Sequence, residues 1–586
     1  MKDLISFSKI ARQFVGVKLY YLLFLVIAAA LLQGLGISLM LPLLQGVESE
    51  NEINKAISLV FGYLDLDYTF RSVLLLMTGF FFLRGYFLIY QARLLAKVIA
   101  RLLVSLRCKE SQRIFEADYQ YLLKNDIGYL SNTVVREFEG VINGFKNYVN
   151  FMAGVVYSSV YIVLPLIVNF TVTGIIFILG IPAFYFLRKI NLELRDCSIQ
   201  QSAHSARLQG FIIQAFGYLK YLKSTHSYGS VLSKIVHESK VLGELKYRKA
   251  VLDSIANHAF EPFAVLMLCG VLFYSVEIMG QDILEIVFML YLIKQCLTSL
   301  LSIQVNFRKF ISSVGSVNVY TRLSKELTEH AESIQREGMN SDFKSPIRFR
   351  DVSFGYDIRE PVLKNINLSI PPKGTVAFVG GSGAGKSTLV NLLTGLIKPT
   401  TGEILIGDVN YEEINQDSHR EEIGYITQET VIFNDSIENN ISLWNEEISE
   451  EEIKQASERA HIRAFIEALP ESYRTLLGDG GINISGGQRQ RIMIARELCK
   501  KSSLLVFDEA TSALDTHSEK EIQRNIDEFK GEKTIVIIAH RLSTVRNSDL
   551  IYVLRDGRIV EEGTYDQLYN LRGEFRSMVD QQMVVA

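Results

Sequence analysis

The sequence predicts a two-domain chain: a membrane domain built only of helices, followed by a soluble α/β domain. Apolar residues make up 48% of the 586 residues, and the mean hydropathy of +0.18 is high for a chain of which 21% is charged. Segments 19–47 and 147–187 contain no charged residue, and about 20 apolar residues are enough to span a bilayer. Most charged residues follow position 325, where short β-rich runs and turns begin. We therefore expect a transmembrane domain at residues 1–325, a linker at 326–345 and the α/β domain at 346–586.

Hydrophobic runs predict six transmembrane helices, and the basic residues between them predict their orientation. The spans lie near residues 19–44, 72–92, 148–168, 172–188, 255–277 and 284–306. Loop 45–70 has one Lys against five acidic residues, whereas segments 93–146 and 188–250 are rich in Lys and Arg. Because cytoplasmic loops carry the excess of Lys and Arg, we expect both termini and the α/β domain in the cytoplasm. The chain is then a multi-pass protein of the inner (plasma) membrane.

The two long basic segments repeat apolar residues at helical spacing, so the spans are expected to continue as long cytoplasmic helices. Near residues 119–133 and 217–230, Gly, Asn and Ser interrupt this pattern. A short transverse helix that lies against another domain fits each break, and so does an ordinary turn. In the outer loop, the apolar residues of segment 51–64 share one face, which fits a helix lying at the outer membrane surface or a packed turn.

Three ionisable residues, Arg84, Glu261 and Lys294, fall within predicted spans. A charge at that depth costs several kcal/mol unless it is paired or solvated, so each is a candidate substrate-site residue. Glu261 fits equally well a structural pair that holds helices together. Two cations within the membrane suggest that the substrate carries an anionic group.

Net charge and cysteine usage exclude some classes of protein. A net charge of −3 gives no electrostatic basis for binding nucleic acid. The five cysteines lie singly along the chain, without the spacing of metal ligands or of disulfides. This usage fits a chain that faces a reducing cytoplasm.

A phosphate-binding loop marks the α/β domain. The segment TVAFVG is predicted to be a buried strand, and it leads directly into GGSGAGKST. This is the P-loop pattern in its strand-to-helix context, in which backbone N–H groups wrap phosphates and the Lys reaches the β and γ phosphates. The predicted phosphate-binding residues are Gly380, Gly381, Ser382, Gly383, Ala384, Gly385, Lys386, Ser387 and Thr388, with Ser387 also a ligand of Mg²⁺.

Two further predicted strands bring polar side chains to the same edge of the sheet. The strand LLVFDEA ends in Asp508 and Glu509, at the edge where ligands bind in open α/β sheets. Asp508 is expected among the Mg²⁺ ligands, and Glu509 can orient or deprotonate the attacking water. The strand TIVIIAH delivers His540 to this edge.

In this order, the motifs resemble the nucleotide-binding domain of an ABC transporter. The resemblance identifies Tyr356 as the aromatic residue that stacks on adenine, and Gln428 as a residue that senses Mg²⁺ and contacts the membrane domain. It identifies His540 as a switch that contacts the γ-phosphate, and Asp515 as part of a loop that crosses to the partner subunit. The signature motif starts with Ile484 where the family usually has Leu, and it continues with Ser485, Gly486, Gly487 and Gln488.

Six spans followed by one such domain resemble an ABC exporter half-transporter, so the resemblance implies ATP hydrolysis with Mg²⁺ in a homodimer. In such a dimer Ser485 and Gly487 contact ATP held by the partner's P-loop, and Glu509, His540 and Gln428 are catalytic. A membrane regulator or channel that only binds ATP is less favoured, because Glu509 is present.

The substrate is suggested by a narrower resemblance. The segments GISLMLPLL, FLRGY, FNDSIENNI and GDGGINISGGQ are most similar to those of bacterial flippases of lipid-linked oligosaccharides. That group transports a polyprenyl pyrophosphate carrying sugars, by alternating access. A multidrug exporter or an exporter of a lipid A-like lipid is the alternative.

Overall fold

The computed structural model describes residues 16–45, 52–258, 283–332, 338–508 and 516–585, apart from positions 64, 66, 169, 342, 357–360, 540 and 543, together with isolated residues between 259 and 282. The chain divides into two compact units. The first comprises Met1–Ala117 and Tyr121–Ala331, and the second comprises Glu332–Ala586 and Asp118–Gln120.

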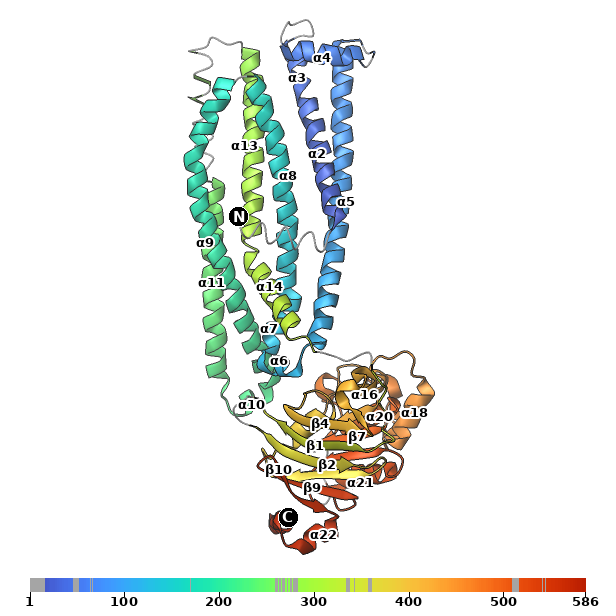
Figure 1. Ribbon diagram of the computed structural model, residues 1–586. Helices are drawn as coiled ribbons and strands as arrows, with labels where there is room; N and C mark the ends of the chain where they lie inside the picture. Colours follow the sequence, from blue (N-terminus) through green and yellow to red (C-terminus); the bar gives the residue numbers. More distant parts are fainter. Residues whose placement is uncertain are drawn as a thin grey trace. The chain divides into compact units, whose positions relative to one another are not determined.

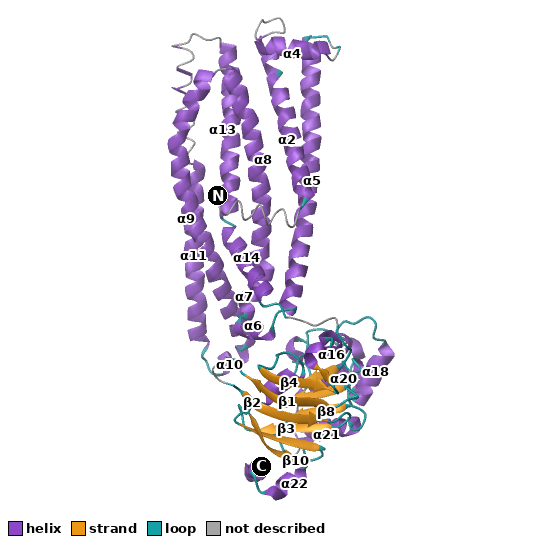
Figure 2. Cartoon of the chain, in the orientation of Figure 1, coloured by secondary structure: helices purple, strands orange, loops and turns teal. Residues whose placement is uncertain are grey.

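The secondary-structure elements described in the first unit are all helices (Figures 1 and 2). Its elements are α2 (Val17–Ser38), α3 (Met40–Gln45), α4 (Glu52–Tyr63), α5 (Phe70–Phe115), α6 (Tyr119–Lys124), α7 (Ile127–Asn132), the π-helical turn η1 (Thr133–Glu137), α8 (Phe138–Val168), α9 (Phe170–Gly217), α10 (Leu219–Ser224), α11 (Tyr228–His258), α13 (Ile283–Ile311) and α14 (Val314–Glu329).

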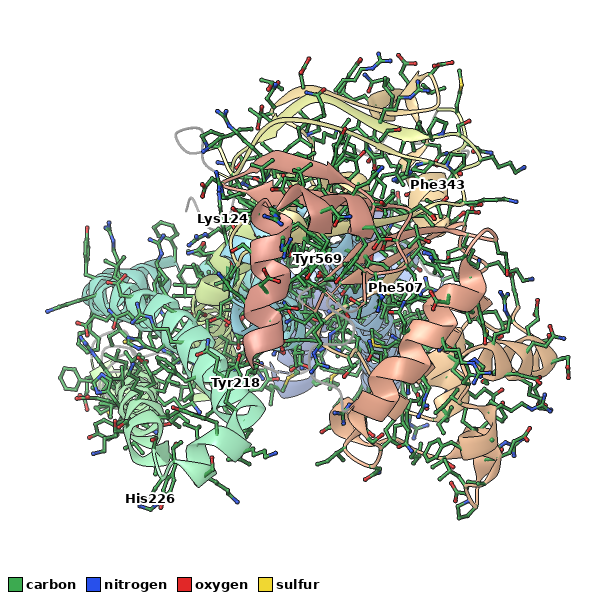
Figure 3. All side chains as sticks on the ribbon, turned by 90° about the horizontal axis from the view of Figure 1, so that it is seen from below. Lys124, Tyr218, His226, Phe343, Phe507 and Tyr569 are labelled. Carbon is green, nitrogen blue, oxygen red and sulfur yellow. The ribbon has the colours of Figure 1, made fainter. Side chains whose placement is uncertain are left out.

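The predicted long helices are confirmed, because α5 and α9 run for 46 and 48 residues. Short helices occupy both predicted breaks: α6 and α7 lie in the first break, and α10 lies in the second. Tyr218 and His226 flank α10 (Figure 3). The outer-loop segment is also helical, and α4 lies across the ends of α2 and α5 (Figure 1).

Three of the described segments are long and apolar enough to span a membrane: Val17–Leu44, Phe70–Phe115 and Ile127–Ile167. The predicted spans at 172–188 and 284–306 are helical and lie in α9 and α13. The predicted span at 255–277 begins in the last turn of α11 and continues mostly outside the described residues.

Small residues bring the helices of this unit close together. A Cβ at Gly128 of α7 would lie 2.5 Å from Cα of Gly210 of α9, and one at Gly315 of α14 would lie 2.4 Å from the carbonyl oxygen of Ser198. These contacts leave no room for a side chain, so α7, α9 and α14 pack backbone against backbone.

The second unit contains two sheets. A six-stranded sheet has the order β10-β9-β3-β8-β7-β6, and a four-stranded antiparallel sheet has the order β2-β1-β4-β5. The strands are β1 (Ile347–Phe354), β2 (Leu363–Ile370), β3 (Thr375–Gly380), β4 (Thr401–Ile406), β5 (Val409–Asn410), β6 (Ile423–Ile426), β7 (Leu504–Asp508), β8 (Thr534–Ile538), β9 (Leu550–Arg555) and β10 (Arg558–Gly563). The helices are α15 (Lys386–Leu393), α16 (Gln416–Glu421), α17 (Ile437–Ser442), α18 (Glu450–Arg459), α19 (Arg463–Glu467), α20 (Gly486–Cys499), α21 (Thr516–Phe529), α22 (Tyr565–Leu571) and α23 (Glu574–Val585).

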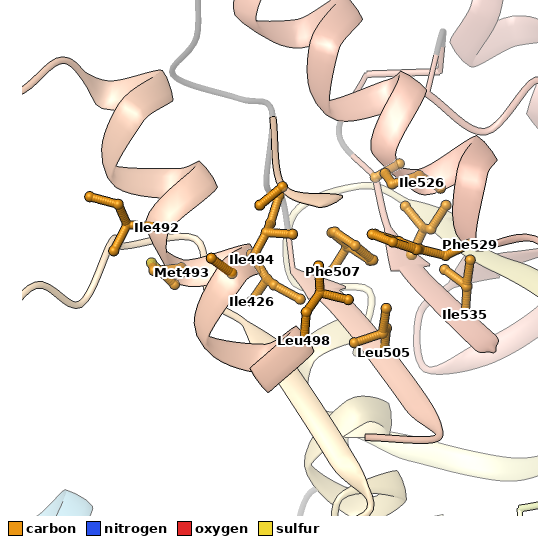
Figure 4. Close-up of a cluster of buried hydrophobic side chains, with 14 of the residues drawn as sticks. Ile426, Ile492, Met493, Ile494, Leu498, Leu505, Phe507, Ile526, Phe529 and Ile535 are labelled. Atoms are coloured by element: carbon orange, nitrogen blue, oxygen red, sulfur yellow. The ribbon is translucent and has the colours of Figure 1, made fainter. Parts of the chain in front are cut away.

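The six-stranded sheet separates two apolar cores, because successive residues of a strand point to opposite faces. On β3, Ala377 and Val379 enter one core and Val376 and Phe378 enter the other. The first core is filled by α17 to α23 and includes Phe507 of β7 (Figure 4). The second core is filled by α15 and the four-stranded sheet. All five β3 residues before Gly380 are buried, which explains why the four after Thr375 are all apolar.

Candidate nucleotide site

The P-loop joins β3 to α15 as the sequence predicts. Gly383 and Gly385 adopt φ of +79° and +102°, values that residues with a side chain rarely take. The space above Gly381 and Gly383 is open, since a Cβ at either glycine would meet nothing within 4 Å. Gly385 is the N-cap of α15, and it provides no side chain to cap the first N–H groups of this helix. The loop therefore forms a cradle of backbone donors suited to phosphate.

Lys386 lies inside this loop. Its Nζ donates to the carbonyl oxygens of Gly380 and Gly381 at 2.9 and 3.0 Å, and only 5% of the residue is exposed. The next residue, Ser387, is exposed. A buried ammonium and an exposed hydroxyl at the start of a helix provide donors for an anion and an oxygen for a hard cation.

The register of the parallel strands brings Asp508 to the P-loop edge. Asp508 lies opposite Ile538 of β8, and Ile538 lies opposite Phe378 of β3, two residues before Gly380. The carboxylate of Asp508 accepts a hydrogen bond of 2.9 Å from the hydroxyl of Tyr425. Burial and the neighbouring Asp508 raise the pKa of Tyr425, so this hydroxyl remains protonated and acts as the donor.

Of the four other predicted residues of this site, the structure describes one, Gln428. Gln428 is exposed and follows β6 by two residues, at the same edge as Asp508. Glu509, Asp515 and His540 lie outside the described residues.

Tyr356 is connected to the P-loop through two intervening residues, Phe354 and Leu363. Its ring packs edge-on against Phe354 with ring centroids 5.0 Å apart. Phe354 pairs with Leu363 across β1 and β2, and a Cβ at Gly385 would lie 2.6 Å from Cδ2 of Leu363. Tyr356 is 41% exposed, so its ring has a face available to a ligand.

The signature motif caps α20. Ser485 is the N-cap: its Oγ accepts from the N–H of Gln488 at 3.3 Å, and the side chain of Gln488 accepts from the N–H of Ser485 at 2.8 Å. Arg489 donates to the carbonyls of Gly481 and Ile484, each at 3.1 Å, and so holds the preceding loop. The capping box orients an exposed Ser485 at a helix N-terminus.

Helix α15, which follows the P-loop, and helix α20, which begins in the signature motif, lie on opposite faces of the six-stranded sheet. Leu389, Val390 and Leu393 of α15 belong to one core, whereas Ile492 and Met493 of α20 belong to the other. A sheet therefore separates the bodies of these two helices within one chain.

The candidate substrate residues lie in the helical unit. Nε of Arg84 is buried and has no hydrogen-bond partner among the described residues, and the guanidinium lies within electrostatic reach of the hydroxyls of Tyr157 and Tyr161. Tyr161 is also close to Tyr291, which precedes the exposed Lys294 by three residues on α13. Glu261 lies outside the described residues.

Comparisons with known proteins identify the family. A family model described as ABC transporter matches residues 363–512. The chain is 30% identical to the ATP-dependent lipid A-core flippase of Pasteurella multocida over 538 residues, which are 88% of this chain and 90% of that protein. The chain belongs to the ABC transporter family. This ABC transporter is an exporter half-transporter, with one helical membrane domain and one ATPase domain, and such exporters couple ATP hydrolysis to transport.

Two further similarities agree with this assignment. Over 240 residues, the ABC transporter is 45% identical to the ATP-dependent lipid A-core flippase of Desulfotalea psychrophila, a match that covers 41% of this chain and 42% of that protein. A bacterial Atm1-family ABC exporter with ATP bound has the same fold, with a TM-score of 0.78 at 23% identity over 98% of this chain and 99% of that chain.

Sequence reasoning did not identify Tyr425 as a site residue. Tyr425 belongs to no phosphate-binding motif, and only the pairing of β6 with β7 brings its hydroxyl to Asp508. A Tyr three residues before Gln428 was the available signal, but its partner could not be deduced from spacing along the chain.

Proposed function

We propose that this ABC transporter works as a homodimer, in which each ATP site combines the P-loop of one chain with the signature motif of the other. The position of α15 and α20 on opposite faces of one sheet supports this arrangement. ATP that closes the two ATPase domains would shift the population of membrane-domain states, and hydrolysis would reset it. Transport then proceeds by alternating access.

The roles of the site residues follow from their chemistry. The N–H groups of residues 380–388 and the ammonium of Lys386 bind the phosphates, and Tyr356 stacks on adenine. Ser387, Gln428 and Asp508 are the oxygen donors for Mg²⁺. The metal, when bound, neutralises charge on the β and γ phosphates. Glu509, Gln428 and His540 complete the catalytic set, and Asp515 connects to the partner.

The proposed substrate is a lipid with a phosphorylated, glycosylated headgroup. Arg84 supports it, because a buried guanidinium nitrogen in a membrane helix, with no partner among the described residues, suits a phosphate oxygen. A lipid-linked oligosaccharide is one candidate. A lipid A-like glycolipid fits equally well and is favoured by the names of the relatives.

Reconstituted vesicles with each labelled lipid test the substrate. We expect ATP-dependent flipping of one of the two lipids, and Arg84→Gln should reduce it by about tenfold through the loss of one charge-assisted contact. Arg93→Gln is the matched control, because Arg93 is exposed on the same helix, α5. Failure to flip either lipid, with ATPase activity stimulated by hydrophobic drugs, would favour a multidrug exporter instead.

A further inference from the structure

Tyr425 connects two strands of the ATPase sheet at the position proposed for Mg²⁺. On the paired strands, Tyr425 of β6 lies opposite Val506 of β7. Side chains two residues apart on a strand share a face, so Val506 and Asp508 point to the same side as Tyr425. The phenol therefore runs along the strands toward Asp508, and its hydroxyl donates to Oδ2 of that carboxylate at 2.9 Å.

The backbone of Tyr425 is also held in place. It lies within β6, which pairs with β7 over Ile423–Ile426. Tyr425 is thus fixed through its backbone by strand pairing, and it hydrogen-bonds to Asp508 through its side chain. Rotation of the phenol or of the Asp508 carboxylate requires breaking this hydrogen bond in a partly buried environment, where a lost hydrogen bond is costly.

The geometry points to Tyr425 as a positioning residue for Asp508, a role that rests on the proposed Mg²⁺ site. A carboxylate that binds a metal must present its oxygens in a defined orientation, and hydrogen bonds from neighbouring groups set that orientation. Tyr425 acts only through Asp508. Removal of the hydroxyl takes away one hydrogen bond that orients the carboxylate, so the metal-dependent part of nucleotide binding weakens.

Binding of the non-hydrolysable analogue AMPPNP to the full-length protein, with and without Mn²⁺, measures this effect. Bound Mn²⁺ is followed by electron paramagnetic resonance. In the wild type, Mn²⁺ tightens AMPPNP binding. In Tyr425→Phe this tightening should fall by about tenfold, the loss usual for a hydrogen-bond partner of a metal ligand, while metal-free affinity is unchanged.

Tyr552→Phe is the matched control. Tyr552 is a buried tyrosine on β9 of the same sheet, and its hydroxyl hydrogen-bonds with the backbone N–H and carbonyl of Ser369 at 2.9 and 3.0 Å. Loss of the Tyr552 hydroxyl should leave the tightening of AMPPNP binding by Mn²⁺ unchanged. An equal loss in both variants would trace the effect to a weakened sheet and overturn the role.

Further outcomes distinguish this role from the metal site itself. Undiminished tightening in Tyr425→Phe would overturn the positioning role, whereas a wild type without any Mn²⁺ effect would overturn the proposed metal site.

In an Asp508→Asn background, Tyr425→Phe should cause no further change in metal-free or Mn²⁺-dependent affinity, and an additional loss would count against the role. Tyr425→Leu, with the same expected outcomes, replaces Tyr425→Phe if that variant does not fold.

Discussion

The imidazole of His419 shows how one buried side chain joins separate segments of the ATPase domain. Its Nε2 lies 3.0 Å from the carbonyl oxygen of Leu393, which can only accept, so Nε2 carries the proton. Its Nδ1 then accepts from the hydroxyl of Ser341 at 3.2 Å. The ring also contacts Phe343 and Tyr411. Burial lowers the pKa of His419 from 6.5 to about 4.

The lowered pKa of His419 predicts loss of stability in acid. The unfolded chain binds this proton more readily, so the stabilisation is complete above the unfolded pKa of 6.5 and is lost as pH falls toward 4. Between pH 7 and pH 5 we expect the free energy of unfolding to fall by about 2 kcal/mol from this group. Denaturant unfolding followed by the fluorescence of Trp444, the single tryptophan, measures it.

A matched pair of variants isolates the contribution of His419. His419→Gln should remove this part of the pH dependence, because Gln does not titrate. His461→Gln changes a partly exposed histidine of the same domain and should retain this part of the pH dependence. Equal pH dependence in the wild type and His419→Gln would show that His419 is not the titrating group.

At the scale of the element, close contacts decide where a helix tolerates a side chain. Gly128 of α7 lies against Gly210 of α9, whereas Gly243 of α11 has open space where a Cβ would stand. Both glycines are helical. Helix propensity alone favours Ala over Gly at either position.

Alanine at these two positions should therefore have opposite effects. Gly243→Ala should stabilise the protein by up to about 1 kcal/mol through helix propensity. Gly128→Ala should destabilise it by about 1–3 kcal/mol, because α7 must move away from α9. Thermal unfolding of the purified protein in detergent measures both. A stabilised Gly128→Ala protein would show that the two helices do not pack this closely.

At the scale of the whole molecule, shared ATP sites predict complementation between inactive variants. Lys386→Ala removes the P-loop cation, and Ser485→Arg blocks the signature motif without touching the P-loop. Each homodimer should therefore hydrolyse ATP at least about 100-fold more slowly than the wild type. In a heterodimer of the two, both defects fall in one site and the other site is intact.

An equimolar mixture, refolded or coexpressed, should recover about one quarter of wild-type ATPase activity, since about half of the dimers are mixed and each has one intact site. Tandem affinity purification of the mixed dimer, with two different tags, should raise the recovery to about one half. The two sites must act independently for these fractions to hold. Absence of any recovery in purified mixed dimers would contradict the shared site.

Much of the fold could be predicted because its signals are local. The apolar run before GGSGAGKST is strand β3, the apolar stretch at 19–44 lies in helices α2 and α3, and that at 72–92 lies in helix α5. The P-loop itself is a local motif, so its glycine conformations follow from residues close in sequence. The roles of all the predicted site residues remain predictions, and Glu261, Glu509, Asp515 and His540 also lie outside the described residues.

The sequence by itself determined the two classes of domain, the P-loop and the strand that carries Asp508, because hydrophobic periodicity and glycine spacing act over a few residues. Only the tertiary structure decided that Tyr425 reaches Asp508, that His419 joins Ser341 to Leu393, and that α15 and α20 lie on opposite faces of a sheet. The Tyr425–Asp508 contact depends on strand order and register, whereas the contacts of His419 and the positions of α15 and α20 depend on how helices pack on the sheets. Both bring together residues that are distant along the chain.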